Sequence, residues 1–514
     1  MSATRPGGRI YSSAAPERPG SRRARPDGRP GGRVHDRERR HDRERRHDRE
    51  RRHDRSADTT ASAIAPRVPL AVHDLMAALA TAGHDAYVVG GSLRDVVLGR
   101  APEDWDLTTD APPDRMREIL PDAAYENRFG TVVVPRDGLL YEITTYRSES
   151  GYADHRRPDE VAFGSTLDED LARRDFTMNA MAWGRSAAAA RESLDPELVD
   201  PFGGLADIRA GIVRAVGDPV ARFGEDALRM PRAIRFSAVL GFTIEPATLA
   251  AIAGRAADVR LLSGERVGGE MGRILVAPSP SVGLRLADST GLLEPLLPEV
   301  TAQHGVPQAK IDGEDLWDHS LRTVDAVRGD LALRYAALLH DVGKPAAMAD
   351  GRFIHRDVVG ARVADTILDR MRVERAIRER VVRLVRHHMF SYEMTWSDAA
   401  IRRFLRRVGV DLVDDLIALR VADDVGSGLP PDGPRTTDLR RRCDEQLAAR
   451  VPLGRRDLAI DGDDLIAELG LQPGPLVGRI LDRLTDKVVD EPRLNERRGL
   501  LATARAMVRS TEDR

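Results

Sequence analysis

The chain of 514 residues has a single cysteine, Cys443, and only three lysines, at positions 310, 344 and 487. One cysteine excludes an internal disulfide framework and a cysteine-based metal site, and it fits a reducing cytoplasm. No apolar run approaches the roughly 18 residues that a membrane span needs, and the N-terminus has no apolar signal-peptide core. We therefore expect a cytoplasmic protein with no membrane partner and, from its length, several domains. The excess of arginine over lysine is explained as well by codon composition as by function.

Charge is unevenly distributed along the chain. The net charge of −3 hides 18 arginines against 10 acidic residues within residues 1–66. The rest of the chain therefore carries more acidic than basic residues. Any nucleic-acid binding beyond residue 66 must then rest on a local arginine face. Residues 1–66 have little apolar content and are predicted to be disordered. Their repeated "HDRERR" could suggest metal binding, but a solvated low-complexity tail explains it better, and its arginines can attract RNA phosphates.

The remaining chain changes from mixed to helical patterning. Between residues 70 and about 185, β-branched runs such as "AYVVGG" and "TVVVP" alternate with helical stretches, and from Phe223 onward the apolar spacing is almost entirely helical. The predicted fold class is α+β, with an α/β head followed by helices. The predicted divisions are a disordered tail at 1–66, a head at 67–215, a neck and body at 216–305, a further helical domain at 306–428 and a C-terminal helical tail at 429–514.

A first candidate site lies in "YVVGGSLRDVVLGRAPEDWDLTTD", residues 87–110. Gly90 and Gly91 end an apolar strand and let backbone N–H groups approach an anion, while Ser92 and Arg94 add a hydroxyl and a charge. Residues i and i+2 of a strand face the same way, so Asp104 and Asp106 converge. Two such carboxylates beside a phosphate cradle are how Mg²⁺ is held. Glu142, flanked by apolar residues, is predicted to be a third inward carboxylate on a neighbouring strand.

In order, "VVGGSLRD", "DWDLTTD", "EITTYR", "RRDFTMNA", "DPFGGLADI" and "GEDALRMPRAIRF" resemble the DNA polymerase beta superfamily. Within that superfamily they are similar to the bacterial CCA-adding tRNA nucleotidyltransferase and poly(A) polymerase family. The resemblance covers roughly residues 70–300. It implies a polymerase-beta-like head in which Asp104 and Asp106 bind catalytic metals and Glu142 assists. It also implies that Gly90, Gly91, Ser92 and Arg94 contact phosphate. Arg174, Asp175 and Asn179 would address the ribose, with Asp175 and Asn179 on one helix face.

The motif "GEDALR" bears on base selection. Asp226 and Arg229 are three residues apart, which predicts that they share one face of a helix. An aspartate that accepts and an arginine that donates match the edges of cytosine and adenine and leave unpaired groups against guanine and uracil. Pro231 departs from the family pattern, in which this helix position is usually apolar. It predicts a bend that disturbs the placement of Arg232, also a candidate nucleotide-binding residue, and of Arg235.

A second candidate site is a His/Asp series in the helical half. It comprises "LWDHSL", "ALLHDVGKP", "RFIHRDVVGAR", "RLVRHHMF" and "VADDVGSG", and such a cluster can hold one or two divalent ions. The series resembles the HD-domain phosphohydrolases. The resemblance implies a ligand set of His319, His340, Asp341 and Asp423, with His355 and His387 serving a second metal. His388 is a spare histidine, and Asp424 is an alternative to Asp423.

These patterns and the family resemblance together imply template-independent addition of C, C and A to tRNA 3′ ends from CTP and ATP. Mg²⁺ is expected in the head and a divalent metal in the HD domain, which could add a phosphatase or cyclic phosphodiesterase activity. A poly(A) polymerase shares nearly every motif and is the first alternative. A non-catalytic RNA-binding protein with relic domains is the second, although the intact Asp104, Asp106, Asp226 and Arg229 set argues against it.

Overall fold

A computed structural model describes residues 63–125, 130–150, 160–163, 166–192, 194–308, 310–349, 356–431 and 433–512. The predicted disordered tail and its repeats lie outside these residues, apart from 63–66. Those four residues are already helical, and Ile64 is buried. Regular structure is therefore present a few residues before the predicted boundary at 67.

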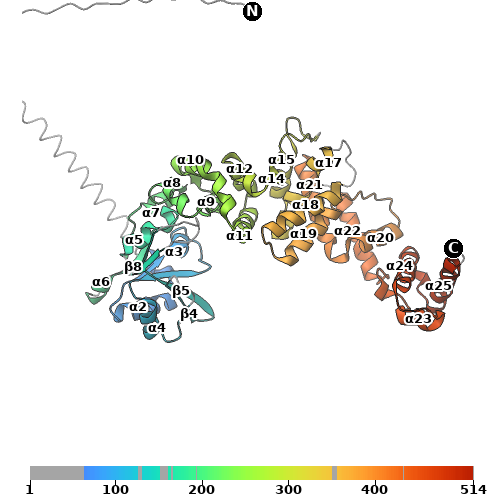
Figure 1. The fold of residues 1–514 in the computed structure, drawn as a ribbon, viewed down its shortest axis with the longest axis horizontal. Helices are drawn as coiled ribbons and strands as arrows, with labels where there is room; N and C mark the ends of the chain where they lie inside the picture. Colours follow the sequence, from blue (N-terminus) through green and yellow to red (C-terminus); the bar gives the residue numbers. More distant parts are fainter. Residues whose placement is uncertain are drawn as a thin grey trace, which may run out of the picture. The chain divides into compact units, whose positions relative to one another are not determined.

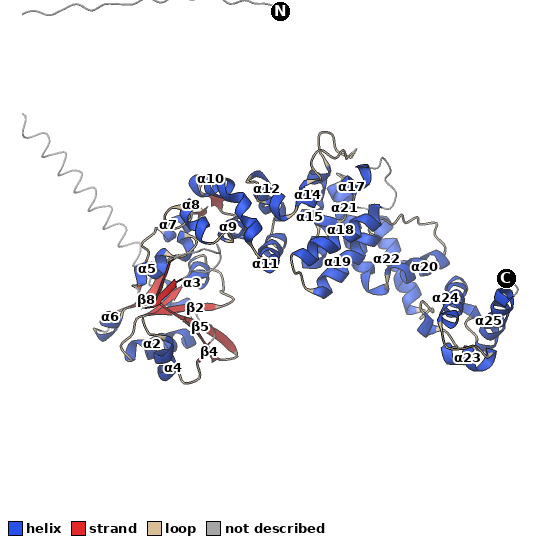
Figure 2. Cartoon of the chain, viewed as in Figure 1, coloured by secondary structure: helices blue, strands red, loops and turns tan. Residues whose placement is uncertain are grey.

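The strands are gathered in the head, and the rest of the described chain is almost entirely helical (Figures 1 and 2). The main sheet has seven strands in the order β3-β4-β5-β2-β1-β8-β9. All its neighbouring pairs are antiparallel except β2 with β5. Its strands are β1 (Ala86–Val89), β2 (Trp105–Thr109), β3 (Ala124–Tyr125), β4 (Thr131–Arg136), β5 (Leu139–Thr145), β8 (Ala182–Arg185) and β9 (Glu197–Val199). Two small sheets pair β6 (Arg147–Ser150) with β7 (Glu160–Phe163) and β10 (Ile212–Val213) with β11 (Thr243–Ile244).

Helices of the head pack around this sheet. Helix α2 contributes a buried apolar face, including Val72, Leu75 and Leu79, because its leucines and valines recur at helical spacing. Helix α3 starts directly after β1, so the chain turns from strand to helix at Gly90. The helices are α2 (Leu70–Thr81), α3 (Gly90–Val97), α4 (Pro113–Ile119), α5 (Leu167–Ala172), α6 (Ala187–Arg191) and α7 (Gly204–Ala210), with 3₁₀ turns η1 (Ala65–Arg67) and η2 (Thr177–Asn179).

Beyond the head, the described chain is built from helices, apart from the short strand β11. The neck, residues 216–305, contains α8 (Pro219–Glu225), α9 (Arg229–Leu240), α10 (Pro246–Arg255), η3 (Ala256–Leu261), α11 (Gly264–Leu275), α12 (Pro280–Ser289), α13 (Leu293–Leu296) and α14 (Pro298–Thr301). The HD region, residues 306–428, contains α15 (Leu316–Ala326), α16 (Leu331–Leu339), α17 (Lys344–Ala349), α18 (Arg356–Arg370), α19 (Arg375–His387), α20 (Asp398–Val408), η4 (Val410–Leu412) and α21 (Val413–Gly426). The C-terminal segment contains α22 (Gly433–Ala448), η5 (Arg455–Asp457), α23 (Gly462–Leu469), α24 (Pro475–Asp490), η6 (Pro492–Leu494) and α25 (Arg497–Glu512).

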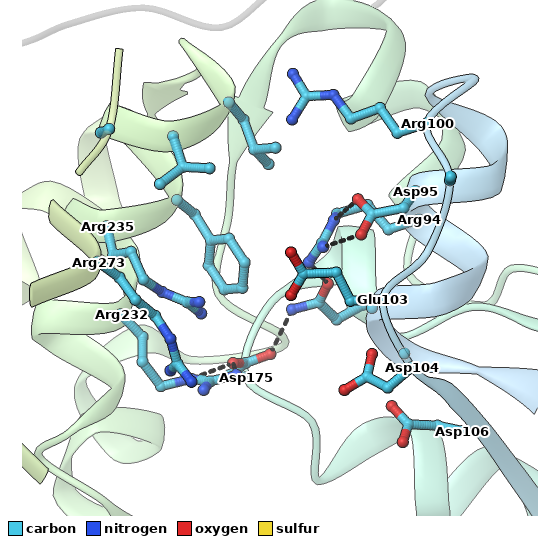
Figure 3. Close-up of a pocket in the computed structure, with 18 of the residues that line it drawn as sticks. Arg94, Asp95, Arg100, Glu103, Asp104, Asp106, Asp175, Arg232, Arg235 and Arg273 are labelled. Atoms are coloured by element: carbon cyan, nitrogen blue, oxygen red, sulfur yellow. Dashed lines mark hydrogen bonds and ion pairs between the residues drawn. The ribbon is translucent and has the colours of Figure 1, made fainter. Parts of the chain in front are cut away.

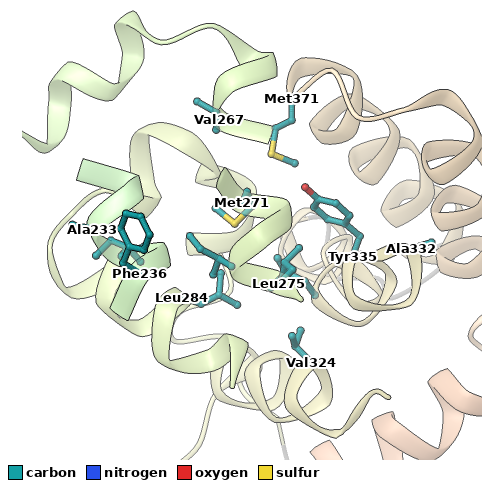
Figure 4. Close-up of a cluster of buried hydrophobic side chains, with 14 of the residues drawn as sticks. Ala233, Phe236, Val267, Met271, Leu275, Leu284, Val324, Ala332, Tyr335 and Met371 are labelled. Atoms are coloured by element: carbon teal, nitrogen blue, oxygen red, sulfur yellow. The ribbon is translucent and has the colours of Figure 1, made fainter. Parts of the chain in front are cut away.

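One hydrophobic cluster extends from Ile64 in the head to Cys443 in α22, and a separate one spans Ile460 to Ala504. Figure 4 shows the part of the large cluster where α11 of the neck, with Met271, lies next to Tyr335 of α16 and Met371. The apolar core is therefore shared between the neck and the HD region.

Glycines allow α11 to approach the HD region this closely. A Cβ at Gly264 would overlap the carbonyl oxygen of Arg370, and a Cβ at Gly268 would overlap that of Met371. Neither glycine has an unusual φ, so the requirement is for space rather than for backbone conformation. The two glycines let the α11 backbone pack directly on the turn that follows α18.

Candidate functional site

Gly90 brings the predicted anion-binding turn and one of the predicted metal-binding carboxylates together. It begins α3 directly after β1 and has a positive φ of 74°. A Cβ at this position would lie 3.1 Å from Arg174 Nη1 and 3.2 Å from Asp106 Oδ2. Glycine is therefore needed both for its conformation and because the arginine and the carboxylate approach the backbone here. At Gly91 a side chain would meet only Arg94 at ordinary distances.

The carboxylates of β2 and β5 lie on one face of the sheet. On β2, Asp106 stands between the buried residues Trp105 and Leu107. Asp106 is in register with Glu142 of the neighbouring parallel strand β5, so Glu142 lies beside it, on an exposed part of the face. Glu142 therefore lies on a neighbouring strand, as the sequence predicts, although that part of the sheet is open to solvent.

Asp104 and Asp106 form a repulsive pair that a divalent cation would relieve. Burial and, after it, the negative charge of Asp104 raise the pKa of Asp106, whereas Arg174 lowers it. Figure 3 shows both carboxylates on the same side of the pocket. Two close carboxylates with an incomplete counter-charge are a donor set that suits a hard divalent ion.

The predicted phosphate and ribose contacts divide into two groups. Arg94 lines the pocket, and its Nη1 donates to Asn179 Oδ1 at 2.9 Å. Ser92 instead is buried: its hydroxyl donates to the carbonyl of Val89 and accepts from the backbone N–H of Asp106. Ser92 therefore fixes the end of β1 against β2, and it does not line the pocket.

Asp175 and Asn179 are brought together by a loop rather than by a shared helix face. Helix α5 ends at Ala172, and Asn179 ends the 3₁₀ turn η2. The Asn179 side chain nevertheless donates to Asp175 Oδ1 at 3.0 Å. The predicted proximity is correct and the predicted helix is wrong, because Phe176 pairs across to Ala215 and interrupts helical bonding.

Asp175 links the head to the neck. Its Oδ2 accepts from Arg232 Nε of α9 at 2.8 Å. Burial acts to raise the pKa of Asp175, but Arg232 and the Asn179 amide outweigh it and hold the pKa at about 2. The carboxylate is therefore ionised and serves as a fixed anchor for an arginine of the pocket.

These residues line a cavity of about 710 Å³. Figure 3 shows Glu103, Asp104 and Asp106 on one side, with Arg232, Arg235 and Arg273 opposite. An acidic wall supplied by the head thus faces a basic wall supplied by α9 and α11. A polyanion bound together with a divalent cation matches both walls.

Sequence reasoning missed Glu270 of α11, which organises the basic wall. Its side chain is buried and its oxygens lie 2.8 Å from Arg235 Nε and 3.3 Å from Arg273 Nη1. Arg235 also packs over the Phe236 ring at 4.1 Å, and burial lowers its pKa to about 10. The sequence signal that could find Glu270 is an acidic residue at a helix position expected to be buried. A buried carboxylate almost always has a paired partner.

Asp226 and Arg229 do not share a helix face, and neither lines the cavity. Asp226 follows the last residue of α8 in extended conformation, whereas Arg229 begins α9. Arg266 Nη2 lies 2.6 Å from Asp226 Oδ2, and Arg229 Nη1 lies 2.7 Å from Glu225 Oε2. The prediction of one continuous helix is wrong because the chain breaks between the two residues, which turns their side chains to different partners.

Pro231 does not disturb the helix in the way the sequence suggested. It occupies the third position of α9, where a backbone N–H would have no partner within the helix. Arg232 and Arg235 therefore follow in regular helix, and both line the cavity.

The HD cluster is assembled from three helices. His319 lies within α15, His340 follows the last residue of α16, and Asp423 lies near the end of α21. The His319 and His340 Nε2 atoms are 3.0 Å apart, and His319 Nε2 is 3.3 Å from Asp423 Oδ1. One ligand atom from each of the three residues lies within 4.8 Å of the others.

These residues fit a divalent metal. His340 Nδ1 lies 2.8 Å from the carbonyl of Ala337, so a proton on Nδ1 leaves Nε2 free to ligate. Asp341 Oδ2 lies 3.2 Å from His340 Nε2. Two imidazole nitrogens and the Asp423 carboxylate converge, with Asp341 beside His340, and such nitrogen and oxygen donors are ligands of transition metals and zinc.

The second-metal prediction has a different outcome. His355 lies outside the described residues. His387 ends α19, where the charges acting on it are Arg386, Arg407 and Arg383 rather than the cluster. The spare residue His388 is the one that approaches Asp341, at 3.7 Å. A metal-binding role for His387 therefore stays a prediction, whereas His388 is the histidine of this pair for which an approach to the cluster is observed. Asp423, rather than its alternative Asp424, is in the cluster.

Within the described residues, no helix is both long and apolar enough to cross a lipid bilayer.

Comparison with known families covers most of the chain. Residues 86–214 match the family described as "Poly A polymerase head domain", and residues 241–303 match "Probable RNA and SrmB- binding site of polymerase A". Residues 316–427 match "HD domain", and residues 444–504 match "tRNA nucleotidyltransferase domain 2 putative". The candidate carboxylates and the histidine cluster fall within the first and third of these matched regions, respectively.

Full-length relatives give a consistent result. A CCA-adding enzyme of Levilactobacillus brevis is 34% identical over 82% of this chain and 94% of its own length. One of Geobacillus stearothermophilus is 33% identical over 82% of this chain and 92% of its own length. The crystal structure of the Bacillus stearothermophilus CCA-adding enzyme in complex with CTP is 30% identical, covering 86% of this chain and 97% of that one, with a TM-score of 0.62. The chain belongs to the family of CCA-adding enzymes, which are nucleotidyltransferases.

Proposed function

We propose that this chain adds C, C and A to the 3′ end of tRNA from CTP and ATP with Mg²⁺. The observation that carries the proposal is the cavity in which Asp104 and Asp106 face the arginines of α9 and α11. The solved relative with CTP supports the nucleotide, and its name supports the product. In the reaction the terminal 3′-oxygen bonds to the α-phosphorus, the α–β bridging bond breaks, and pyrophosphate leaves.

The chain's own residues bind and orient the reactants in this proposal. Asp104 and Asp106 hold the divalent ion, which when bound neutralises phosphate charge and favours the ionised 3′-hydroxyl. Asn179 holds Arg94 and Asp175 holds Arg232, so the two arginines would present fixed cations to the phosphates and ribose. Because these arginines are already anchored, they lose little side-chain freedom when a ligand binds. They are therefore suited to holding the reactants in a fixed orientation.

For base selection we propose Asp226 and Arg229. Asp226 follows α8 and Arg229 begins α9, so the short break between the two helices has an acceptor on one side and a donor on the other. Arg266 and Glu225 satisfy them in the unliganded chain. A cytosine or adenine edge must therefore replace these partners, whereas guanine and uracil would leave unpaired polar groups in their place.

The test uses a tRNA that lacks CCA and each nucleotide alone and in combination. The expected result is addition of C, C and A followed by termination, with no incorporation of G or U. A long tail made from ATP alone would favour the poly(A) polymerase alternative. Binding of the tRNA without any incorporation would instead favour a non-catalytic RNA-binding protein.

We propose a second activity for the HD region: metal-dependent hydrolysis of a phosphate monoester or 2′,3′-cyclic phosphate at a nucleotide end. The arrangement of His319, His340, Asp341 and Asp423 supports it. Purified protein loaded separately with Mg²⁺, Mn²⁺, Ni²⁺ or Co²⁺ is tested on p-nitrophenyl phosphate and 2′,3′-cyclic AMP. Hydrolysis with at least one ion is expected. No turnover with any of them would favour a docking scaffold.

A further inference from the structure

Two lysines beside the HD cluster indicate a substrate-binding site. The proposed hydrolysis names metal ligands but no residues that bind the substrate. The chain has 79 basic residues of which only Lys310, Lys344 and Lys487 are lysines. The first two lie on the same cavity, of about 370 Å³, beside the HD cluster. Arginine bias alone says nothing about function, but two of three lysines at one cavity indicate that the shape of the lysine ammonium matters there.

Both lysines stand where the cavity meets the cluster. The cavity is lined by Asp341 and Asp423, whereas His319 and His340 are buried behind them. Lys344 Nζ lies 2.5 Å from Asp341 Oδ2, and Lys310 Nζ lies 3.5 Å from Asp423 Oδ1. A ligand that enters this cavity therefore meets one ammonium group beside each carboxylate.

The surroundings of Lys344 hold its charge in place. Its side chain is 11% exposed, and it begins α17 directly after Gly343. A Cβ at Gly343 would crowd Gly360 of α18, so the backbone is fixed close to that helix. Lys310 is more exposed, at 40%, and its Nζ also donates to Ser427 Oγ at 2.7 Å. One cation is therefore rigid and the other can adjust to a ligand.

The charge balance favours an anion. The cavity carries Lys310, Lys344, Arg356 and Arg420 against two carboxylates that face the metal-ligating cluster. Arg420 is occupied in part, because it donates to the carbonyl of Phe390 and lies over that ring at 5.0 Å. A compact ammonium presents one point charge near a metal, whereas a planar guanidinium needs room for a fork of donors.

We propose that Lys344 and Lys310 form a phosphate-binding pair that seats the terminal phosphate of a nucleotide or RNA end against the HD cluster. The proposal rests on the proposed hydrolytic function of this region and names its substrate-binding residues. Lys344 would hold one non-bridging oxygen beside Asp341, and Lys310 would close over another from the loop that precedes α15. Arginine at either position would be too broad for the same role.

The experiment measures binding of inorganic phosphate to the full-length, metal-loaded protein by calorimetry, together with metal content by mass spectrometry. Lys344→Met and Lys310→Met should each weaken phosphate binding by about tenfold or more, which corresponds to about 1.4 kcal/mol. Lys344→Arg should not restore it. Lys487→Met, which changes the remaining lysine in α24, is the matched control and should bind normally. Metal content should be unchanged in all four variants.

Two results would overturn the proposal. One is wild-type phosphate binding in both methionine variants, and the other is a parallel loss of bound metal, which would make the lysines structural parts of the cluster. Lysine-dependent phosphate binding without any hydrolysis would instead refute the proposed activity and leave the pair in place. Competition by tRNA ending in a 3′-phosphate, but not by tRNA ending in a 3′-hydroxyl, assigns the phosphate to an RNA end. Competition by mononucleotides alone assigns it to small substrates, and the pair stands in either case.

Discussion

The two candidate sites use carboxylates in different ways. In the head, Asp104 is exposed and Asp106 half-buried, on a sheet face that opens onto a large cavity. In the HD region, His319 and His340 are about 1% exposed and contact the cavity only through their carboxylate partners. An open acidic pair suits an ion that arrives with a polyphosphate, whereas a buried His/Asp cluster suits an ion that stays with the protein.

The largest effect is expected from Asp106→Ala in the head. Loss of one of the two carboxylates proposed to hold the metal should reduce nucleotide addition by roughly 10³-fold or more, since about 4 kcal/mol of transition-state stabilisation is at stake. The measurement is single-turnover addition to tRNA lacking CCA, with tRNA binding followed separately and expected to persist. Glu103→Gln, a neighbouring carboxylate of the same wall, is the control and should retain most activity. Equal losses of nucleotide addition in both variants would show that the ion site includes the whole acidic wall.

The next effect contrasts the two sites directly. His340→Ala combined with Asp341→Ala should remove bound metal and abolish the proposed hydrolysis, because two of the four proposed metal ligands are lost. CCA addition should stay within a fewfold of wild type. The thermal midpoint should fall, since a bound metal stabilises only the folded state. Loss of CCA addition with the fold intact by circular dichroism would show that the two regions act as one catalytic unit.

The part of the head site that depends on local backbone geometry could be predicted from the sequence. Alternation along a strand places Asp106 on the face opposite Trp105. The sequence also predicts Glu142 on a neighbouring strand, but its register with Asp106 is set by the parallel pairing of β2 with β5. The partners of Asp226 could not be predicted, because its neighbour Arg266 comes from another helix 40 residues away. The break before Arg229 was missed for a related reason. Helical spacing continues through "GEDALRMPRAIRF" even though the backbone does not.

Base selection should show an intermediate effect. Arg229→Ala removes the donor of the proposed base-reading pair, so misincorporation of UMP and GMP should rise by about tenfold, or about 1.4 kcal/mol. Arg222→Ala is the matched control, because Arg222 also pairs with Glu225, at 2.9 Å, and lies on α8 rather than at the break. It should leave discrimination unchanged. Unaltered discrimination in Arg229→Ala would place base reading elsewhere, with the Arg235 side of the cavity as the first candidate.

The smallest expected effect tests whether the neck and the HD region are held together through α11. Gly268→Ala would place a methyl group against the Met371 carbonyl and should destabilise the protein by about 1–3 kcal/mol. At the adjacent Gly269, an added Cβ would meet no atom within 4 Å. Gly269→Ala should therefore stabilise the helix by up to about 1 kcal/mol. Glu270 follows directly and holds Arg235 and Arg273, so Gly268→Ala should also reduce nucleotide addition severalfold, while Gly269→Ala should not. If the thermal midpoint and the rate of nucleotide addition changed in the same direction in both variants, the docking of α11 on the HD region would not influence the nucleotide cavity.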